Sequence, residues 1–170
     1  MLNRPSIINM PVYHHPTPIG TAVITEEDGY ITAISVSGDE SENTETPSET
    51  ILTAVKQMDE YFAGKRLTFD LPLKPKGTKF QQEVWQHLQT ISFGSTITYT
   101  QQSKQMQQPL AIRAIAAANG KNKLWIVIPC HRVIGSGGEL TGYAGELWRK
   151  KWLLEHEAKI AGIGQLSLSF

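Results

Sequence analysis

The sequence is poor in cysteine: Cys130 is the only one among 170 residues. A single cysteine excludes an internal disulfide framework and any metal site built from cysteines alone. No apolar run approaches the roughly 18–20 residues that span a bilayer. The first residues also lack the charged start and continuous apolar stretch of a secretory signal peptide. We therefore expect a protein of the reducing cytoplasm with no membrane partner.

Net charge is absent as well, with 16 Lys and Arg against 16 Asp and Glu, but the two signs are unevenly distributed. Residues 1–78 carry 6 basic and 11 acidic side chains, a net charge of −5, whereas residues 79–170 carry 10 and 5, a net charge of +5. This asymmetry favours an anionic partner for the C-terminal part. Two solvated surfaces that happen to differ are the alternative at this point.

The N-terminal part begins with the pattern of a β-hairpin. Gly20–Thr25 and Tyr30–Val36 are rich in Ile, Val and Thr, and they flank the turn dipeptide Asp28-Gly29. The segment that follows, Gly38–Ser48, is acidic and without apolar residues, so an exposed loop is expected there.

A helix is expected from about Thr46. Thr46 and Glu49 have capping-box spacing, and Pro47 suits the first helical position. Apolar residues at helical spacing then predict one buried face, made of Ile51, Val55, Met58 and Phe62. The prolines and glycine of Leu71–Thr78 read as a linker, so we expect domains at 1–72 and 79–170 with 73–78 between them.

The C-terminal part is predicted to be mainly helical. Its first helix follows Thr78 and Gln81, which again have capping-box spacing. Two short helices, at about Thr100–Met106 and Pro109–Ala118, flank a tight break and resemble a helix-turn-helix, with Asn119-Gly120 as the stop. A last helix is expected at about Glu146–His156, with Trp148 and Trp152 on one face.

The helix Pro109–Ala118 has an unusual polar face. Ile112, Ile115 and Ala116 share the side expected to face the core, whereas the opposite side holds Leu110, Arg113, Ala114 and Ala117. Small side chains allow close approach to another surface, and a single Arg can project beyond them. The alternative is a helix buried on both sides with an ion-paired Arg.

Cys130 lies in the run Pro129-Cys130-His131-Arg132-Val133. A free thiol has a pKa near 8.5, so a nucleophilic cysteine needs a base or cation to favour the thiolate. His131 and Arg132 follow directly, although adjacent residues point apart in extended backbone and a bridging water is then needed. A buried structural cysteine is the alternative, and spacing alone does not choose a reaction.

This run is similar to the active-site signature of the O6-alkylguanine-DNA alkyltransferases, the methylated-DNA–protein-cysteine methyltransferases. The resemblance covers nearly all of residues 80–157 and, in the N-terminal part, Tyr61-Phe62-Ala63-Gly64. The other matching segments are Phe80-Gln81-Gln82-Glu83-Val84-Trp85, Phe93-Gly94, Tyr99, Arg113-Ala114, Ala118-Asn119-Gly120, Asn122, Gly142-Tyr143-Ala144-Gly145 and Trp152-Leu153-Leu154-Glu155-His156-Glu157.

The resemblance implies an α+β protein with a small ribonuclease-H-like N-terminal domain. It implies that Cys130 takes an alkyl group from guanine O6, and also from thymine O4, in one displacement that leaves a stable thioether. Each molecule would then act once, without an organic cofactor. In the same family reading His131 takes the thiol proton through a water, and Glu157 orients and stabilises His131.

The remaining site residues are also assigned by the resemblance. Tyr99 would donate to guanine N3 and turn the 3′ phosphate, and Asn122 would hold the active-site turn. Backbone of Val133 would accept from the guanine amine. Tyr143 and Ala144 would lie on the loop that closes over the base.

The implied partner is double-stranded DNA, bound through the minor groove by a monomer. An alkylated base cannot be attacked in line inside a duplex, so it must flip out. Arg113 matches the arginine that fills the vacated space, and Ala114 lies beside it. Lys104, Lys121 and Lys123 are candidate phosphate contacts.

The chain departs from the common family pattern in several places. Ala144 replaces a frequent Ser, which removes a hydroxyl donor and predicts altered rate rather than loss. The other departures are Ile112, Ala116, Lys123, Trp125 and Glu146. No metal site is expected, because the cysteines that hold structural zinc in some relatives are absent and His14-His15 alone is a poor site.

Two other classes of function remain open at this stage. A DNA-binding sensor of the alkyltransferase-like kind would lack this cysteine, so Cys130 argues against it. A Cys–His hydrolase would need an oxyanion site and repeated turnover, which the sequence does not suggest.

Overall fold

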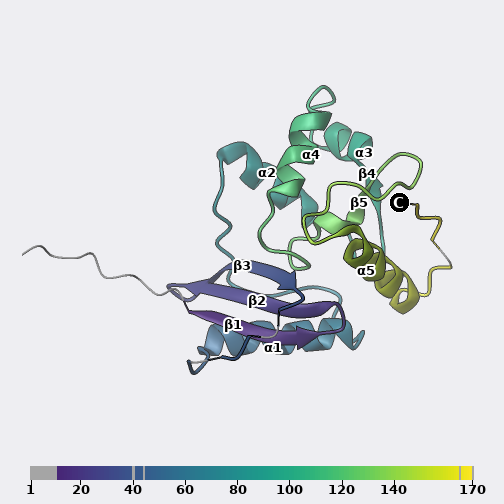
Figure 1. The fold of residues 1–170 in the computed structure, drawn as a ribbon. Helices are drawn as coiled ribbons and strands as arrows, with labels where there is room; N and C mark the ends of the chain where they lie inside the picture. The colour runs from purple at the N-terminus through teal and green to yellow at the C-terminus, as the bar shows by residue number, and fades with distance from the viewer. Residues whose placement is uncertain (1–10, 40, 44, 165, 170) are drawn as a thin grey trace, which may run out of the picture.

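The structure, a computed structural model, describes residues 11–39, 41–43, 45–164 and 166–169. Residues 1–10, for which we expect no signal peptide, lie outside these ranges. A small sheet with one helix is followed by a mainly helical part, which confirms the predicted α+β class (Figure 1). No helix in the described ranges is long and apolar enough to cross a bilayer.

The N-terminal sheet is antiparallel, in the order β1-β2-β3. The predicted hairpin is confirmed as β2 (Gly20–Glu27) and β3 (Tyr30–Ser37), and Asp28 and Gly29 have the positive φ angles of 52° and 80° that a tight hairpin turn requires. The edge strand β1 (Val12–Thr17) was not predicted, because its Val-Tyr-His-His-Pro-Thr sequence has no apolar alternation.

Helix α1 (Glu49–Phe62) packs on one face of this sheet (Figure 1). The predicted cap at Thr46 is wrong: Ser48 is the N-cap, and its hydroxyl accepts from the backbone N–H of Ile51 at 3.1 Å. The buried face is also rotated from the prediction. Val55 and Phe62 are half-buried, and the buried residues are Ile51, Ala54, Gln57, Met58 and Tyr61.

Two capping boxes start the first helices of the C-terminal part. Thr78 and Gln81 cap α2 (Lys79–Leu88), as predicted, and Thr98 and Gln101 cap α3 (Tyr99–Gln105). Helix α4 (Ile112–Gly120) begins three residues later than predicted, because Pro109 and Leu110 lie in the preceding turn. Asn119-Gly120, the expected stop, forms the last residues of α4 rather than lying beyond it.

A buried amide pair joins α3 to α4. The side-chain amide of Gln102 donates to Asn119 Oδ1 at 3.2 Å, and that of Asn119 donates to Gln102 Oε1 at 2.7 Å. Both residues are buried, so each amide group depends on the other. The pair fixes the angle between the two helices of the helix-turn-helix.

The chain then reaches a single 3-10 turn, η1 (Cys130–Arg132), and a short strand β5 (Val133–Ile134) that pairs in parallel with β4 (Ile97–Thr98). The last helix, α5 (Leu147–Ile160), is longer than predicted. Its two tryptophans differ, since Trp152 packs against Phe62 while Trp148 is 45% exposed.

The sheet is joined directly to the segment that precedes Cys130. The backbone N–H of Ile34 in β3 donates to Lys123 O at 2.8 Å, and the N–H of Trp125 donates to Ile34 O at 3.0 Å. Arg149 of α5 also donates to Ile19 O at 2.8 Å. The N-terminal part therefore fixes the backbone on which the candidate nucleophile is mounted.

Candidate active site

Cys130 follows a tightly folded stretch of backbone. The N–H of Val127 donates to Trp125 O across Ile126, whose φ is 72°, and the N–H of Cys130 donates to Ile128 O across Pro129. Positive φ is rare for a β-branched residue and costs backbone strain. This geometry persists because Ile126 and Ile128 are buried in the core.

Asn122 holds this stretch in place from one side. Its amide nitrogen donates to Ile128 O at 2.8 Å and lies 3.2 Å from Cys130 Sγ, while its amide oxygen accepts from the N–H of Leu124 at 2.9 Å. The structure places Asn122 at the turn, and it adds a contact with the sulfur that was not predicted.

Cys130 is buried, with 8% of the residue exposed. Burial raises its pKa, although the Asn122 amide and the Lys150 charge act in the opposite direction. The sulfur is consequently protonated at neutral pH and needs a base before it can attack an electrophile.

His131, the residue that follows Cys130, forms a buried pair with Glu157. His131 Nε2 lies 2.8 Å from Glu157 Oε1, and both side chains are almost fully buried. Burial lowers the pKa of His131, although Glu157 acts in the opposite direction. The imidazole is therefore neutral at pH 7, with its Nε2 proton donated to the carboxylate, which leaves Nδ1 as a base.

The Nδ1 atom of His131 is buried and has no hydrogen-bond partner in the described part of the chain. A buried nitrogen of this kind usually binds a water or a substrate group. It is therefore available to accept the thiol proton, as the resemblance implies.

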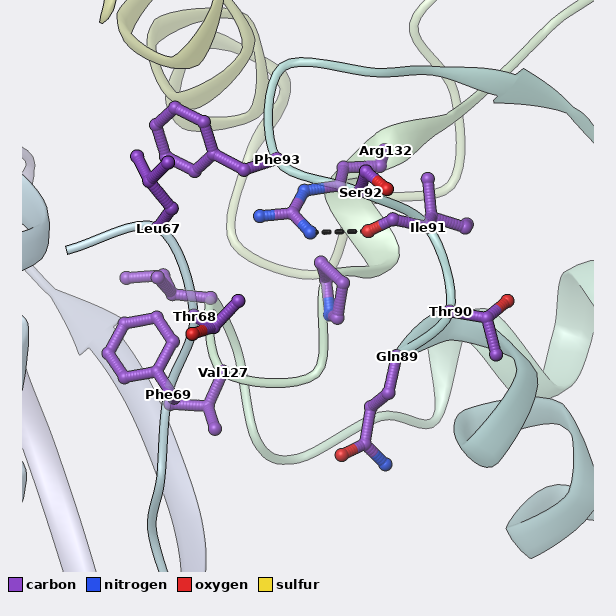
Figure 2. Close-up of a pocket in the computed structure, with 12 residues that line it drawn as sticks. Leu67, Thr68, Phe69, Gln89, Thr90, Ile91, Ser92, Phe93, Val127 and Arg132 are labelled. Carbon is purple, nitrogen blue, oxygen red and sulfur yellow. Dashed lines mark hydrogen bonds between the residues drawn. The ribbon is translucent and has the colours of Figure 1, made fainter. Parts of the chain in front are cut away.

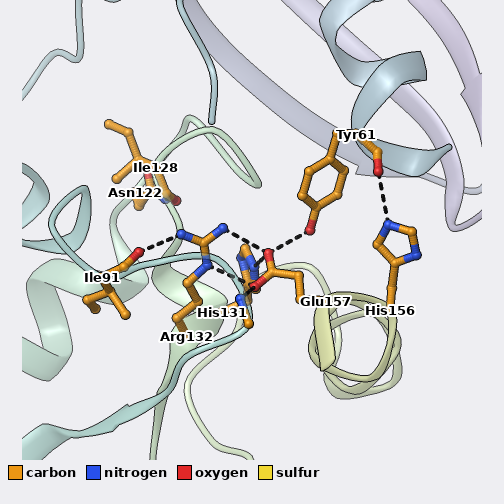
Figure 3. Close-up of polar contacts among 9 residues, drawn as sticks. Tyr61, Ile91, Asn122, Ile128, His131, Arg132, His156 and Glu157 are labelled. Atoms are coloured by element: carbon orange, nitrogen blue, oxygen red, sulfur yellow. Dashed lines mark hydrogen bonds and ion pairs between the residues drawn. The ribbon is translucent and has the colours of Figure 1, made fainter. Parts of the chain in front are cut away.

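The carboxylate of Glu157 collects donors from three parts of the fold (Figure 3). Oε1 accepts from Tyr61 Oη at 2.8 Å, His131 and Arg132 Nη2, and Oε2 accepts from Arg132 Nε at 2.9 Å and from the N–H of Gly94. Burial alone would raise the pKa of Glu157, but His131 and Arg132 outweigh it and hold the pKa well below its usual range. Glu157 is therefore charged at any physiological pH.

Three buried residues near Cys130 were not assigned to the site by sequence reasoning: Arg132, Tyr61 and Lys150. Arg132 lies inside the recognised motif, and Tyr61 lies inside Tyr61-Phe62-Ala63-Gly64, so both had a signal in the resemblance. Lys150 had none. It is buried in α5, and its ammonium donates to Val133 O at 2.6 Å and Thr141 O at 3.0 Å.

The residues expected to contact the base lie at the start of α3 and in the segment that follows Cys130. Tyr99 Oη donates to Thr141 O at 3.1 Å, so it must release that carbonyl to reach a base. Tyr143 is buried with its ring centroid 5.7 Å from that of Trp125, while Ala144 is exposed. The carbonyl of Val133 accepts from Lys150 and retains a second lone pair for another donor.

A cavity of about 310 Å³ adjoins these residues. Asn122, Trp125 and Ala144 line it together with Lys121, Lys123 and two residues of β3. It opens between the two halves of the chain and beside the residue that contacts Cys130 Sγ.

A second cavity, of about 390 Å³, lies behind the active-site turn (Figure 2). Thr68, Gln89 and Ser92 contribute to its wall, and Pro129 and Arg132 reach it from the turn. The Arg132 guanidinium is already held by Ile91 O at 2.6 Å and by Glu157, so the cavity gains no reactive group from it.

Helix α4 presents an exposed face of small residues around one cation. Arg113, Ala114 and Ala117 are exposed, whereas Ile115 and Ala118 are buried. The alternative of a helix buried on both sides is therefore wrong. Lys104, Lys121 and Lys123 are also exposed.

Two family models match the chain. Residues 79–159 match "6-O-methylguanine DNA methyltransferase, DNA binding domain", and residues 12–75 match "6-O-methylguanine DNA methyltransferase, ribonuclease-like domain". The second match gives the sheet and α1 the ribonuclease-like character that was expected.

Curated relatives extend across most of the chain. The constitutive methylated-DNA–protein-cysteine methyltransferase of Bacillus subtilis is 44% identical over 139 residues, which is 76% of this chain and 83% of the relative. A methylated-DNA–protein-cysteine methyltransferase of Mycolicibacterium paratuberculosis is 41% identical over 151 residues, 84% of this chain and 89% of the relative.

Solved structures share the fold. A crystal structure of the Mycobacterium tuberculosis O6-methylguanine methyltransferase has a TM-score of 0.79 and 38% identity, and it covers 87% of this chain and 92% of that chain. A crystal structure of Mycobacterium tuberculosis OGT in complex with DNA has a TM-score of 0.78 and 39% identity, covering 88% and 93%.

Proposed function

Since the chain belongs to the O6-methylguanine DNA methyltransferase family and repairs O6-methylguanine in DNA, we propose that Cys130 is the residue that accepts the methyl group. The observation that carries this proposal is the setting of Cys130: the Asn122 amide lies 3.2 Å from its sulfur, and the next residue in the chain belongs to the buried His131–Glu157 pair. The chain has no other cysteine.

The transfer is one in-line displacement. The sulfur forms a bond to the methyl carbon while the bond from that carbon to guanine O6 breaks, and guanine leaves with the electron pair and takes up a proton. The thiol proton passes to His131 Nδ1 through a water, and Glu157 stabilises the resulting imidazolium. The thioether product is stable, so each molecule acts once.

The chain binds DNA through its helix-turn-helix domain, and we propose that α4 enters the minor groove. The exposed Arg113 and the small Ala114 support close approach of this helix, with Arg113 filling the space left by a flipped base. The exposed Lys104 and Lys123 are proposed phosphate contacts, and neither carries sequence specificity.

Contacts to the flipped base are proposed for the loop beyond Cys130. Tyr99 exchanges Thr141 O for guanine N3, the Val133 carbonyl accepts from the guanine amine, and Tyr143 and Ala144 cover the ring. The hydrogen bond from Tyr99 Oη to Thr141 O, at 3.1 Å, lies on the exposed side of the protein, and this position supports its replacement by a bond to the base. O4-alkylthymine is a second proposed substrate, because it also carries its alkyl group on an exocyclic oxygen.

We further propose a cytoplasmic monomer with domains at 1–72 and 79–170. A thiol that must stay reduced suits that compartment, and one chain supplies every residue of the proposed site. The linker proposal, 73–78, rests on the prolines and glycine of that stretch.

The test is the intact mass of the protein after incubation with duplex DNA that contains O6-methylguanine. We expect an increase of one CH₂ unit, mapped to the Cys130 peptide, with one guanine restored per protein molecule. Cys130→Ser is the control and should bind the duplex without restoring guanine. Restored guanine without a methylated Cys130 would refute the proposal, and repeated turnover would favour a hydrolase.

A further inference from the structure

Tyr61 brings the N-terminal domain into contact with the proposed catalytic pair. The residue lies in the last turn of α1, its side chain is fully buried, and its hydroxyl donates to Glu157 Oε1 at 2.8 Å (Figure 3). The same carboxylate oxygen accepts from His131 Nε2 at 2.8 Å. Tyr61, which is 96 positions from Glu157 in the sequence, therefore donates to the same carboxylate oxygen as His131, the proposed base.

The position of this hydroxyl is fixed by the packing of the ring. Ring centroids of Phe62, Phe69, Phe93 and His156 lie between 5.3 and 5.9 Å from that of Tyr61. The backbone carbonyl of Tyr61 also accepts from His156 Nε2 at 3.0 Å. Two points of attachment to α5, one at Glu157 and one at His156, hold Tyr61 in register with the helix that carries the carboxylate.

We propose that Tyr61 is a positioning residue for methyl transfer: its hydroxyl holds the Glu157 carboxylate in the orientation in which Oε1 accepts from His131. This inference rests on the roles proposed above for His131 and Glu157. It makes the N-terminal domain part of the catalytic machinery, in addition to its structural support of the Cys130 segment.

The donor count explains why one hydroxyl matters. Glu157 accepts from Tyr61, His131, Gly94 and both Nε and Nη2 of Arg132, whereas a carboxylate has about four lone-pair sites. The donors therefore compete, and the strength of the bond to His131 depends on the others. Burial, with Glu157 in support, raises the pKa of Tyr61 well above its usual value, so the phenol remains a donor throughout the working pH range.

Removing the hydroxyl changes both geometry and charge. The carboxylate loses one support, so orientation of His131 is relaxed and the rate falls. The negative charge of the Glu157 carboxylate is also less compensated by hydrogen-bond donors. It therefore stabilises the imidazolium more strongly, and the pKa of His131 rises. The other groups with an electrostatic effect on His131 are Arg132 and Lys150, and both favour its neutral form. Cys130 precedes His131 in the chain. Tyr143 has an electrostatic effect on Tyr61, and the His156 ring packs against the Tyr61 ring.

The test is the single-turnover rate of repair of an O6-methylguanine duplex, measured for Tyr61→Phe against pH. We expect a loss of about tenfold at neutral pH and an acid limb displaced to higher pH by a few tenths of a unit. Gln57→Met is the matched control, because Gln57 is buried one turn earlier in α1 and bonds the backbone of Asp70 instead of Glu157. It should lower stability and leave the rate of the folded protein and its pH profile unchanged.

A double-mutant cycle with Glu157→Gln separates the two proposals. If Tyr61 acts through Glu157, Tyr61→Phe has no further effect on the rate in the Glu157→Gln background. A full rate for Glu157→Gln would overturn the role proposed for Glu157. A reduced rate for Glu157→Gln together with a wild-type rate and pH profile for Tyr61→Phe would overturn only the positioning role.

The proposal stays testable if Tyr61→Phe does not fold. Protein with 3-fluorotyrosine at position 61 keeps the ring and strengthens the donor. We then expect the His131 pKa, followed by ¹⁵N NMR of the imidazole, to fall. An unchanged His131 titration would overturn the proposal.

Discussion

At the scale of single residues, the site depends on buried polar groups whose partners are backbone atoms. Asn122 binds Ile128 O and the Leu124 N–H, and Lys150 binds Val133 O and Thr141 O. These bonds join the turn that carries Cys130 to the loop that carries Tyr143. Removing Asn122 leaves the buried Leu124 N–H without its acceptor, and an unpaired buried donor costs more than the bond itself contributes.

Asn122→Ala should lower the free energy of unfolding by about 1–3 kcal/mol, because the buried Leu124 N–H loses its acceptor while Ile128 O keeps its bond from the Cys130 N–H. Urea unfolding of the wild type and the variant measures this difference. Asn43→Ala is a control, because Asn43 also bonds backbone, at His14, but on the exposed surface. A loss no larger than that of the control would contradict the role given to Asn122.

Lys150→Met should change how stability depends on pH. Burial lowers the pKa of Lys150 from 10.5 to about 8, so between these values the unfolded chain holds a proton that the folded protein has lost. Stability contributed at this position therefore rises with pH across that window, by at most about 1.4 kcal/mol per unit. The free energy of unfolding of the wild type, relative to that of the variant, should therefore be higher at about pH 9.5 than at about pH 7.5. A difference that stays constant would show that Lys150 keeps its ordinary pKa.

At the scale of elements, local sequence signals predicted which segments are helical better than the residue at which each helix begins. The capping box of Thr78 and Gln81 is confirmed at α2, whereas α4 begins after Ala111 with no side-chain cap, and its start was placed too early at Pro109. The exposed face of α4 follows from its periodicity. The Gln102–Asn119 pair that sets its angle does not, because the two residues have no local pattern in common.

Ala117→Glu should test the DNA face of α4 without disturbing the fold. Ala117 is exposed beside Arg113, so a carboxylate there meets phosphate and should weaken duplex binding by at least about tenfold, most strongly at low salt. Stability should stay within about 0.5 kcal/mol of the wild type. Leu52→Glu, on the exposed side of α1, is the control for added charge. Equal binding by both variants would place the DNA elsewhere.

At the scale of the whole molecule, the active site lies where the two domains meet. β3 bonds the backbone before Cys130, Arg149 bonds Ile19 O, and Tyr61 bonds Glu157. The recognised motif assigned roles to residues around Cys130, and these roles stay predictions. It could not predict these interdomain contacts, because they join residues far apart in the sequence and have no fixed spacing.

Acid should unfold the protein through the buried pair. Burial lowers the pKa of His131 below 6.5. Just below that pH the imidazole is therefore protonated in the unfolded chain but still neutral in the folded protein. The pKa of Glu157 is also held below its usual value, so protonation of this group favours unfolding as the pH falls further. Both effects have the same sign. Urea unfolding should show stability falling from about pH 6.5 downward, with a shallower fall in His131→Asn. Parallel curves would contradict the assignment.

The central claim is that the methyl carbon moves from guanine oxygen to the sulfur of Cys130. A duplex carrying O6-[¹³C]methylguanine, added in excess over the protein, tests it directly by NMR. The account predicts that the methyl resonance moves from the O–CH₃ to the S–CH₃ region, correlates with the Cys130 side chain, and stops at one label per protein molecule. Label released as methanol, or found on any residue other than Cys130, would contradict it.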